Sequence, residues 1–126
     1  MTVQSILIID DSESDQILCG HAIRAFDPSV KINDVYAAYE GLELLAKRHK
    51  FDVLLLDINM PDMNGFEFLD MYRKIYGNDA HKIYLLLGTA PQSDIHEKIE
   101  EYDCLDGALL KPLDKQDVKK IMGQDA

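Results

Sequence analysis

Four short segments of the sequence carry side chains suited to phosphate or metal chemistry. Each segment directly follows a short apolar run, and the residues concerned are Asp10, Asp11, Asp57, Thr89, Ala90 and Lys111. Carboxylate oxygens are the ligands that Mg²⁺ prefers, a carboxylate can act as a nucleophile, and a lysine ammonium binds phosphate as a point charge. The combination predicts phosphoryl transfer that depends on Mg²⁺.

The individual roles follow from the demands of phosphoryl transfer, which are positioning and neutralisation of the equatorial oxygens. Asp57 is the candidate nucleophile, because an acid at the end of an apolar strand is held rigidly. Carboxylates a few ångströms apart repel one another by about 1 to 4 kcal/mol per pair, and a divalent cation offsets that repulsion. Lys111 is expected to supply further positive charge and Thr89 a hydrogen bond, while the small Ala90 leaves space for the phosphoryl group.

Each of these residues also has an ordinary structural interpretation. Asp10 and Asp11 could cap the helix that follows them. Asp57 could be a solvated loop residue, Thr89 a turn residue and Lys111 a solvated surface lysine. These ordinary explanations must hold at four places independently, whereas a single site explains all four together.

The elements that must position these residues form an alternation of short apolar runs and helical patterns. Buried strands are predicted at residues 6–9, 53–56 and 83–87, a last short strand at 108–110, and a more polar edge strand at 30–36. Each strand is followed by a helical pattern, the first at 14–26 and the last at 114–122. The apolar residues at helical spacing are, in chain order, Ile17, Leu18, Ala22, Ala25 and Phe26; Leu42, Leu45 and Ala46; Phe68, Leu69, Tyr72, Ile75 and Tyr76; Ile95, Ile99 and Tyr102; Val118, Ile121 and Met122.

Strict alternation of strands and helices predicts an α/β fold, a parallel sheet with helices on both faces and right-handed crossovers. The carboxyl ends of parallel strands meet at one edge, and ligands bind in the crevice outside that edge. The four chemically active segments are therefore expected to converge in one place.

Composition narrows the class of protein further. A length of 126 residues suits one domain spanning residues 1–126, and a net charge of −10 disfavours binding to nucleic acid or anionic lipid. No apolar stretch approaches the roughly 20 residues that span a bilayer, and no signal peptide is recognised, so a cytoplasmic location is expected. Cys19 and Cys104 are expected to be reduced thiols in the core.

The combined pattern resembles the receiver domain of response regulators in two-component signalling. The segments that resemble the family are Asp10-Asp11, residues 56–65, Thr89-Ala90, Lys111-Pro112 and residues 38–45. The resemblance implies a flavodoxin-like (βα)5 fold with a five-stranded, doubly wound parallel sheet of order 2-1-3-4-5.

The resemblance also assigns roles to single residues. It makes Asp57 the phospho-acceptor, with Mg²⁺ bound by the side chains of Asp11 and Asp57, by the backbone carbonyl of Asn59, and by Asp10 through a water or a more distant contact. Thr89 would follow the phosphoryl group and Lys111 would pair with it. The Lys111–Pro112 peptide bond is expected to be cis.

The same resemblance implies the partners. The phosphoryl donor would be a sensor histidine kinase or a histidine phosphotransfer protein. The chain is expected to be a monomer without an output domain, which signals by a phosphorylation-dependent contact with a downstream protein. Such a domain is not an enzyme toward other substrates, although it catalyses its own phosphorylation and dephosphorylation. Ala108 departs from the family pattern, because many receivers carry an aromatic residue three positions before the lysine.

Three alternatives remain open at this point. The chain could be a phosphorelay intermediate that passes phosphate onward rather than a diffusible switch. A Mg²⁺-dependent phosphatase with an aspartyl-phosphate intermediate is disfavoured, because Asn59 stands where such enzymes carry a second catalytic acid. A degenerate receiver used only for docking is disfavoured because Asp11, Asp57 and Lys111 are all present.

Overall fold

A five-stranded parallel sheet forms the centre of the molecule. The structure is a computed structural model that describes residues 2–47 and 50–124. The strands follow the order β2-β1-β3-β4-β5, and every neighbouring pair is parallel. Their bounds are Ser5–Ile9 for β1, Lys31–Val35 for β2, Val53–Asp57 for β3, Lys82–Leu87 for β4 and Gly107–Leu110 for β5.

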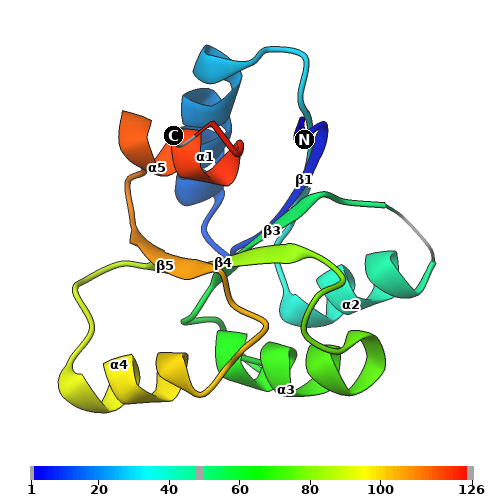
Figure 1. Cartoon of the computed structure of the whole chain (residues 1–126), viewed down its shortest axis with the longest axis vertical. Coiled ribbons are helices and arrows are strands. Elements are labelled where there is room, and N and C mark those ends of the chain that lie inside the picture. Colours follow the sequence, from blue (N-terminus) through cyan, green and yellow to red (C-terminus); the bar gives the residue numbers. More distant parts are fainter. Residues whose placement is uncertain (1, 48–49, 125–126) are drawn as a thin grey trace.

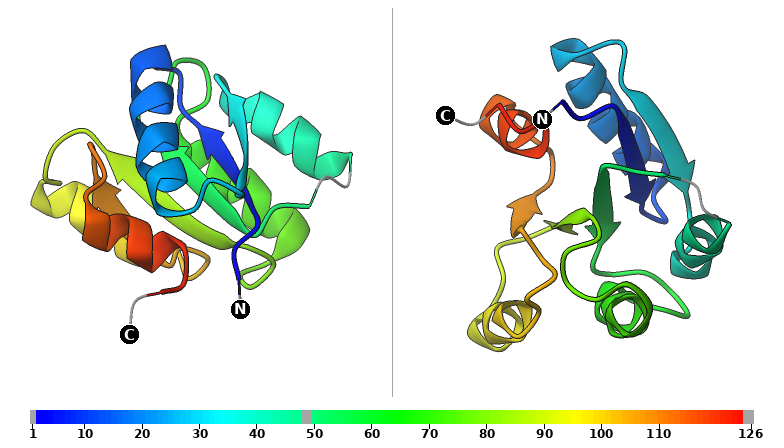
Figure 2. Two further views of the ribbon diagram at one scale, coloured as in Figure 1. Left: turned by 90° about the horizontal axis from the view of Figure 1, so that it is seen from above. Right: turned by 45° about the vertical axis from the view of Figure 1, so that its right-hand side comes forward.

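Helices cover both faces of this sheet. Figure 1 shows α1 and α5 on one face and α2, α3 and α4 on the other, and the two views of Figure 2 agree. The helix bounds are Glu13–Phe26 for α1, Ala38–Ala46 for α2, Gly65–Tyr76 for α3, Ser93–Glu100 for α4 and Lys115–Ile121 for α5. The predicted fold class and the strand order 2-1-3-4-5 are confirmed.

The core consists of two apolar layers separated by the sheet. Alternate residues of a strand point to opposite faces, so Leu54 and Leu56 belong to the layer under α2 and α3, whereas Val53 and Leu55 belong to the layer under α1 and α5. All five residues of β3 are buried, as expected for a central parallel strand. Strand β2 buries only Val35, which confirms its predicted place at an edge.

Helix α1 was predicted correctly, but its apolar pattern does not mark its buried face. Its buried residues are Gln16, Cys19, Gly20 and Ile23, and they form one stripe along the helix. Ile17 and Leu18 lie beside this stripe and are 52% and 57% exposed, and Phe26 is also exposed. The sheet selects a stripe that includes a polar residue, Gln16, because that side chain has hydrogen-bond partners at the strand ends.

The predicted extent of α4 was too long at its end. Helix α4 ends at Glu100, and Tyr102 lies in the turn that follows. The Tyr102 ring stacks on Phe66 with a centroid distance of 5.6 Å, and its hydroxyl donates a hydrogen bond to Asp70 (2.9 Å). Tyr102 is therefore a core residue, as is Tyr84.

The last helix confirms its predicted stripe, because Val118 and Ile121 of α5 and the capping residue Met122 are all buried. Cys19 and Cys104 are free and buried, as expected. Within residues 2–47 and 50–124, we find no helix that is long and apolar enough to cross a bilayer.

Candidate functional site

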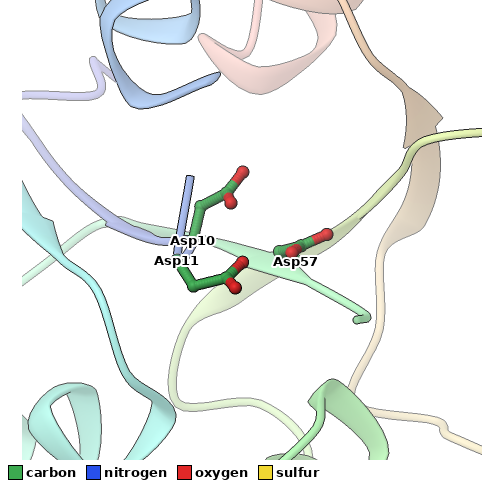
Figure 3. A group of neighbouring side chains, drawn as sticks. All are labelled: Asp10, Asp11 and Asp57. Carbon is green, nitrogen blue, oxygen red and sulfur yellow. The ribbon is translucent and has the colours of Figure 1, made fainter. Parts of the chain in front are cut away.

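Three aspartates meet at the carboxyl edge of the sheet. Asp10 directly follows β1, Asp11 comes next, and Asp57 is the last residue of β3. One carboxylate oxygen from each lies within 4.8 Å of those of the other two, and Figure 3 shows the three side chains as close neighbours. Asp10 is 1% and Asp57 is 5% exposed, whereas Asp11 is open to solvent. The predicted convergence of residues from β1 and β3 is confirmed.

The loop after β3 is shaped so that Asp57 stays at this edge. The Gly65 N–H, at the start of α3, donates a hydrogen bond to the Ile58 carbonyl (3.0 Å). A Cβ atom on Gly65 would lie 3.0 Å from both the Asp57 carbonyl oxygen and the Ile58 Cα, so a larger residue would push against the backbone that carries Asp57. Asn64 and Glu67 form a capping box that fixes the start of the helix.

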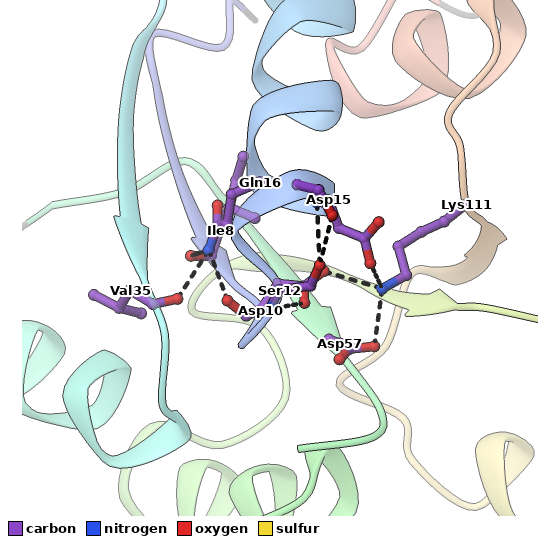
Figure 4. Close-up of polar contacts among 9 residues, drawn as sticks. Ile8, Asp10, Ser12, Asp15, Gln16, Val35, Asp57 and Lys111 are labelled. Carbon is purple, nitrogen blue, oxygen red and sulfur yellow. Dashed lines mark hydrogen bonds and ion pairs between the residues drawn. The ribbon is translucent and has the colours of Figure 1, made fainter. Parts of the chain in front are cut away.

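Lys111 brings the end of β5 into the same cluster. Its ammonium contacts Asp10 Oδ2 at 3.0 Å, Asp57 Oδ1 at 3.4 Å and Asp15 Oδ2 at 2.8 Å, as Figure 4 shows. The Lys111 backbone N–H donates to the Leu87 carbonyl (2.8 Å), which ties the end of β5 to β4. The Lys111–Pro112 peptide bond is cis, as expected.

The electrostatics of the cluster separate the roles of its members. Burial raises the pKa of Asp57 from 3.8 to about 6, and the charge of Asp10 adds to this, although Lys111 and the Asn59 N–H oppose the shift. Burial lowers the pKa of Lys111, but its hydrogen bonds to Asp15 and Asp10 and the charge of Asp57 outweigh burial, so the net shift is upward. Lys111 therefore remains an ammonium, whereas the Asp57 carboxylate is destabilised unless more positive charge arrives.

Thr89 and Ala90 lie on the loop after β4, at the side of the cluster. With Asn59 and Gly88 they line an open cavity of about 240 Å³. All four residues are exposed, and within the described part of the chain no hydrogen bond joins the Thr89 hydroxyl to Asp57. The structure thus brings the three aspartates and Lys111 into contact, and it leaves Thr89 and Ala90 beside them.

Ser12, and neither Asp10 nor Asp11, is the N-cap of α1, so the helix-capping interpretation of the two acids is wrong. The Ser12 side chain is the N-cap of α1 and accepts a hydrogen bond from the Asp15 N–H (3.3 Å). Asp10 Oδ1 accepts from the Ser12 N–H (3.0 Å), and this contact orients Asp10 without making it the cap. The two acids are therefore available to the cluster.

Two residues of the site were missed in the sequence analysis. Asp15 makes the shortest contact to Lys111. The two Nε2 hydrogens of the buried Gln16 side chain are shared among the carbonyls of Ile8 (3.1 Å), Asp10 (3.1 Å) and Val35 (2.9 Å). Both lie in the first turns of α1, directly after Asp10-Asp11. An acid one helical turn beyond Asp11 was the available signal for Asp15.

The donor set of the cluster fits a hard divalent cation. Three carboxylates supply oxygen ligands only, and Mg²⁺ typically binds through one or two carboxylates plus waters and a phosphate. Asp11 faces solvent and makes no contact with Lys111, so its oxygens are open for coordination. The cluster can hold such an ion beside Asp57.

Comparison with known proteins identifies the family to which this chain belongs. The family described as "Response regulator receiver domain" matches residues 6–122. The chain belongs to the response regulator receiver family. Receiver domains are signalling modules of two-component systems, and the resemblance stated from the sequence is confirmed.

Individual relatives agree with the family. The "Two-component response regulator ORR8" of Oryza sativa is 29% identical, and the match covers 97% of this chain and 98% of that protein. The "Probable histidine kinase 5" of Oryza sativa is also 29% identical over 92% of this chain, which spans 11% of that protein.

Solved structures show the same receiver architecture. A two-component response regulator from Legionella pneumophila matches with a TM-score of 0.81 and 28% identity, over 94% of each chain. A response regulator from Cytophaga hutchinsonii matches with a TM-score of 0.87 and 24% identity, over 99% of this chain and 98% of that chain. At that identity the second likeness concerns the fold alone.

Proposed function

We propose that this receiver accepts a phosphoryl group on Asp57 from a phosphohistidine, in a reaction that requires Mg²⁺. The donor is a sensor histidine kinase or a histidine phosphotransfer protein. The observation that supports this proposal best is the contact of Lys111 with Asp10 and Asp57 beside the open carboxylate of Asp11. It combines a nucleophile, a set of metal ligands and a cation for the phosphoryl oxygens in one place.

The transfer step uses the Asp57 carboxylate as the nucleophile. One Asp57 oxygen forms a bond to phosphorus as the phosphorus–nitrogen bond to the donor histidine breaks, and the bonding electron pair stays on that nitrogen. Asp10, Asp11, Asp57 and the Asn59 carbonyl would hold Mg²⁺, which supplies positive charge that offsets the repulsion among the acids and the phosphoryl oxygens. Lys111 pairs with a phosphoryl oxygen, and the Thr89 hydroxyl donates a hydrogen bond to another phosphoryl oxygen.

The signal leaves the site through a protein contact. The surface formed by α4, β5 and α5 is the proposed output surface, and the loop carrying Thr89 couples it to Asp57 by a shift in population. Ala108 on β5 is exposed and provides no aromatic ring for this coupling, so the Thr89 loop carries it. We further propose that residues 1–126 form one receiver domain, and that this domain is cytoplasmic, monomeric and catalyses its own phosphorylation and dephosphorylation.

A phosphorelay intermediate uses the same chemistry on Asp57 and differs only in the later transfer to a second histidine. A phosphatase acting on small substrates is disfavoured, because Asn59 offers no proton for general acid catalysis. A role in docking alone is disfavoured by the intact set of acids around Lys111.

The decisive experiment is phosphorylation with a small phosphodonor and Mg²⁺, followed by intact mass spectrometry. We expect a mass increase of one phosphoryl group that disappears in Asp57→Asn and on removal of Mg²⁺. The matched control is Asp62→Asn, because Asp62 is an exposed acid five positions away with a backbone φ of 66°, a conformation that asparagine also tolerates. The proposal fails if neither a small donor nor a cognate kinase phosphorylates the wild-type chain.

Lys111 has a separate expected role in signalling. Lys111→Ala should still be phosphorylated on Asp57, but its phosphorylated form should bind the downstream partner more weakly. The measurement is partner affinity of the phosphorylated variant, and an affinity equal to that of the wild type would contradict a coupling role for Lys111.

A further inference from the structure

The Lys111 ammonium is shared among three carboxylates, and its shortest contact involves a residue outside the set of site residues predicted from the sequence. The distances are 2.8 Å to Asp15, 3.0 Å to Asp10 and 3.4 Å to Asp57. A lysine ammonium has three N–H donors and no acceptor. The three contacts match the number of donors, so a further acceptor such as a phosphoryl oxygen competes with the carboxylates already bound.

We propose that Asp15 is a positioning residue that holds the Lys111 ammonium in the unphosphorylated protein and competes with the phosphoryl group on Asp57 for it. The inference rests on the proposed function, because it assumes that a phosphoryl group arrives on Asp57. Asp15 then sets how readily Lys111 is available to that group.

The exposure of the three acids decides which contact gives way. The Asp10 side chain is 1% exposed, and loss of Lys111 would leave a buried carboxylate without its cation. The Asp15 side chain is 34% exposed, so water can replace the ammonium around its carboxylate at lower cost. Lys111 is therefore expected to release Asp15 and to retain Asp10 when it pairs with a phosphoryl oxygen.

The surroundings of Asp15 favour this exchange. Its backbone is fixed, because its N–H donates to the N-cap Ser12 hydroxyl. Its side chain borders an open cavity of about 260 Å³ that Lys111, Pro112 and Gly88 also line. The Asp15 backbone is thus anchored, and its carboxylate borders open space into which it can turn without moving α1.

A simpler role for Asp15 is that of an acid in the first turn of a helix, where negative charge is favourable. Glu13 occupies the same turn and is exposed. Glu13→Gln removes the same charge from the same turn and is therefore the matched control. A helix-terminus effect predicts equal behaviour of Asp15→Asn and Glu13→Gln, whereas competition for Lys111 predicts an effect of Asp15→Asn alone.

The test measures the affinity for beryllofluoride, a mimic of the phosphoryl group, in the presence of Mg²⁺ by calorimetric titration. Asp15→Asn should increase the affinity about fivefold, which corresponds to the loss of about 1 kcal/mol of competing attraction in a solvated site. Glu13→Gln should match the wild type. In a Lys111→Ala background, Asp15→Asn should change the affinity by less than about twofold, because the competition passes through Lys111.

The outcomes separate this inference from the proposed function. Equal effects of Asp15→Asn and Glu13→Gln, or a full effect of Asp15→Asn in the Lys111→Ala background, would overturn the inference while wild-type phosphorylation stands. A wild-type chain that neither binds beryllofluoride nor accepts phosphate from acetyl phosphate would instead overturn the proposed function. Thermal unfolding of each variant without Mg²⁺ verifies that all of them are folded.

Discussion

Aspartates lie at both ends of the parallel strands, at the amino edge where the strands begin and at the carboxyl edge where they end. The two edges differ in the hydrogen-bond and ion-pair partners of these carboxylates. At the amino edge, Asp52 Oδ2 accepts hydrogen bonds from the backbone N–H groups of Gln4 (2.8 Å) and Ser5 (3.2 Å). Asp106 Oδ2 likewise accepts from the Ile83 N–H (2.8 Å). Both acids therefore accept hydrogen bonds from neutral backbone N–H groups at the starts of β1 and β4.

At the carboxyl edge, the acids face one another and a single lysine. Asp10 and Asp57 are both buried beside Lys111, and burial together with the charge of Asp10 raises the pKa of Asp57 to about 6. The comparison shows that an aspartate beside a strand is not diagnostic by itself. Acids that accept from backbone amides stabilise the fold, whereas acids that repel one another favour the arrival of a cation or the loss of a charge.

The largest effect is expected from removing the cation of the carboxyl edge. Lys111→Ala leaves Asp10 buried without its ion pair. This should lower the free energy of unfolding by about 3 to 5 kcal/mol at pH 8 without Mg²⁺. The cost should be smaller at pH 5, because protonation of Asp57 relieves the repulsion. Urea unfolding at the two pH values measures it, with the exposed Lys119→Ala as control. Equal costs at both pH values would contradict carboxylate repulsion as the cause.

The next largest effect tests whether the carboxyl edge also depends on neutral hydrogen bonds. Gln16 Nε2 donates to the carbonyls of Ile8, Asp10 and Val35, which joins the ends of β1 and β2. Gln16→Leu should lower the free energy of unfolding by about 2 to 3 kcal/mol, because the hydrogen bonds from Gln16 are lost, although the Val35 carbonyl keeps the Asp10 N–H as a donor (3.1 Å). Gln116→Leu on the exposed part of α5 is the control. If Gln16→Leu lowers the free energy of unfolding no more than the control does, the carbonyls find other donors.

A smaller effect on stability, without an effect on phosphorylation, is expected at the amino edge. Asp52→Asn weakens the hydrogen bonds to Gln4 and Ser5 and should cost about 1 to 2 kcal/mol. Its rate of phosphorylation by acetyl phosphate should match that of the wild type. Chemical denaturation and intact mass spectrometry measure the two quantities. A loss of phosphorylation in folded Asp52→Asn would contradict a purely structural role for the acids at the amino edge.

The smallest effect concerns the pH dependence of stabilisation by Mg²⁺. The pKa of Asp57 is about 6 in the folded, metal-free protein and 3.8 as its ordinary value. Between these values the folded chain retains a proton that the unfolded chain has lost, so the contribution of Asp57 to stability falls as the pH rises. Mg²⁺ binds the carboxylate form, so its stabilisation should grow from pH 5 to pH 7.

Thermal unfolding with and without Mg²⁺ measures this dependence. The increase in Tm caused by Mg²⁺ should be larger at pH 7 than at pH 5 by a few degrees, which corresponds to about 1 kcal/mol. Asp57→Asn should remove most of the difference between the two pH values. A shift in Tm that is independent of pH in the wild type would exclude Asp57 as a metal ligand.

The sequence by itself determined the alternation of strands and helices, the burial of β3, the edge position of β2 and the apolar stripe of α5. These properties depend on local periodicity and on the length of apolar runs, which are visible without any partner element. It also determined that Asp10, Asp57 and Lys111 lie at the carboxyl ends of strands, and hence that they share an edge. The strand order and the cis bond before Pro112 came from the resemblance to receivers, not from periodicity.

Only the tertiary structure decided which face of α1 is buried and which acid holds Lys111. The sheet buries Gln16 and Ile23 and leaves Ile17 and Leu18 exposed, because strand-end carbonyls accept from Gln16. Asp15 and Lys111 are 96 positions apart, and their contact depends on how α1 packs beside the end of β5. Hydrogen-bond partners and burial of this kind are properties of the assembled sheet, and no local pattern of residues encodes them.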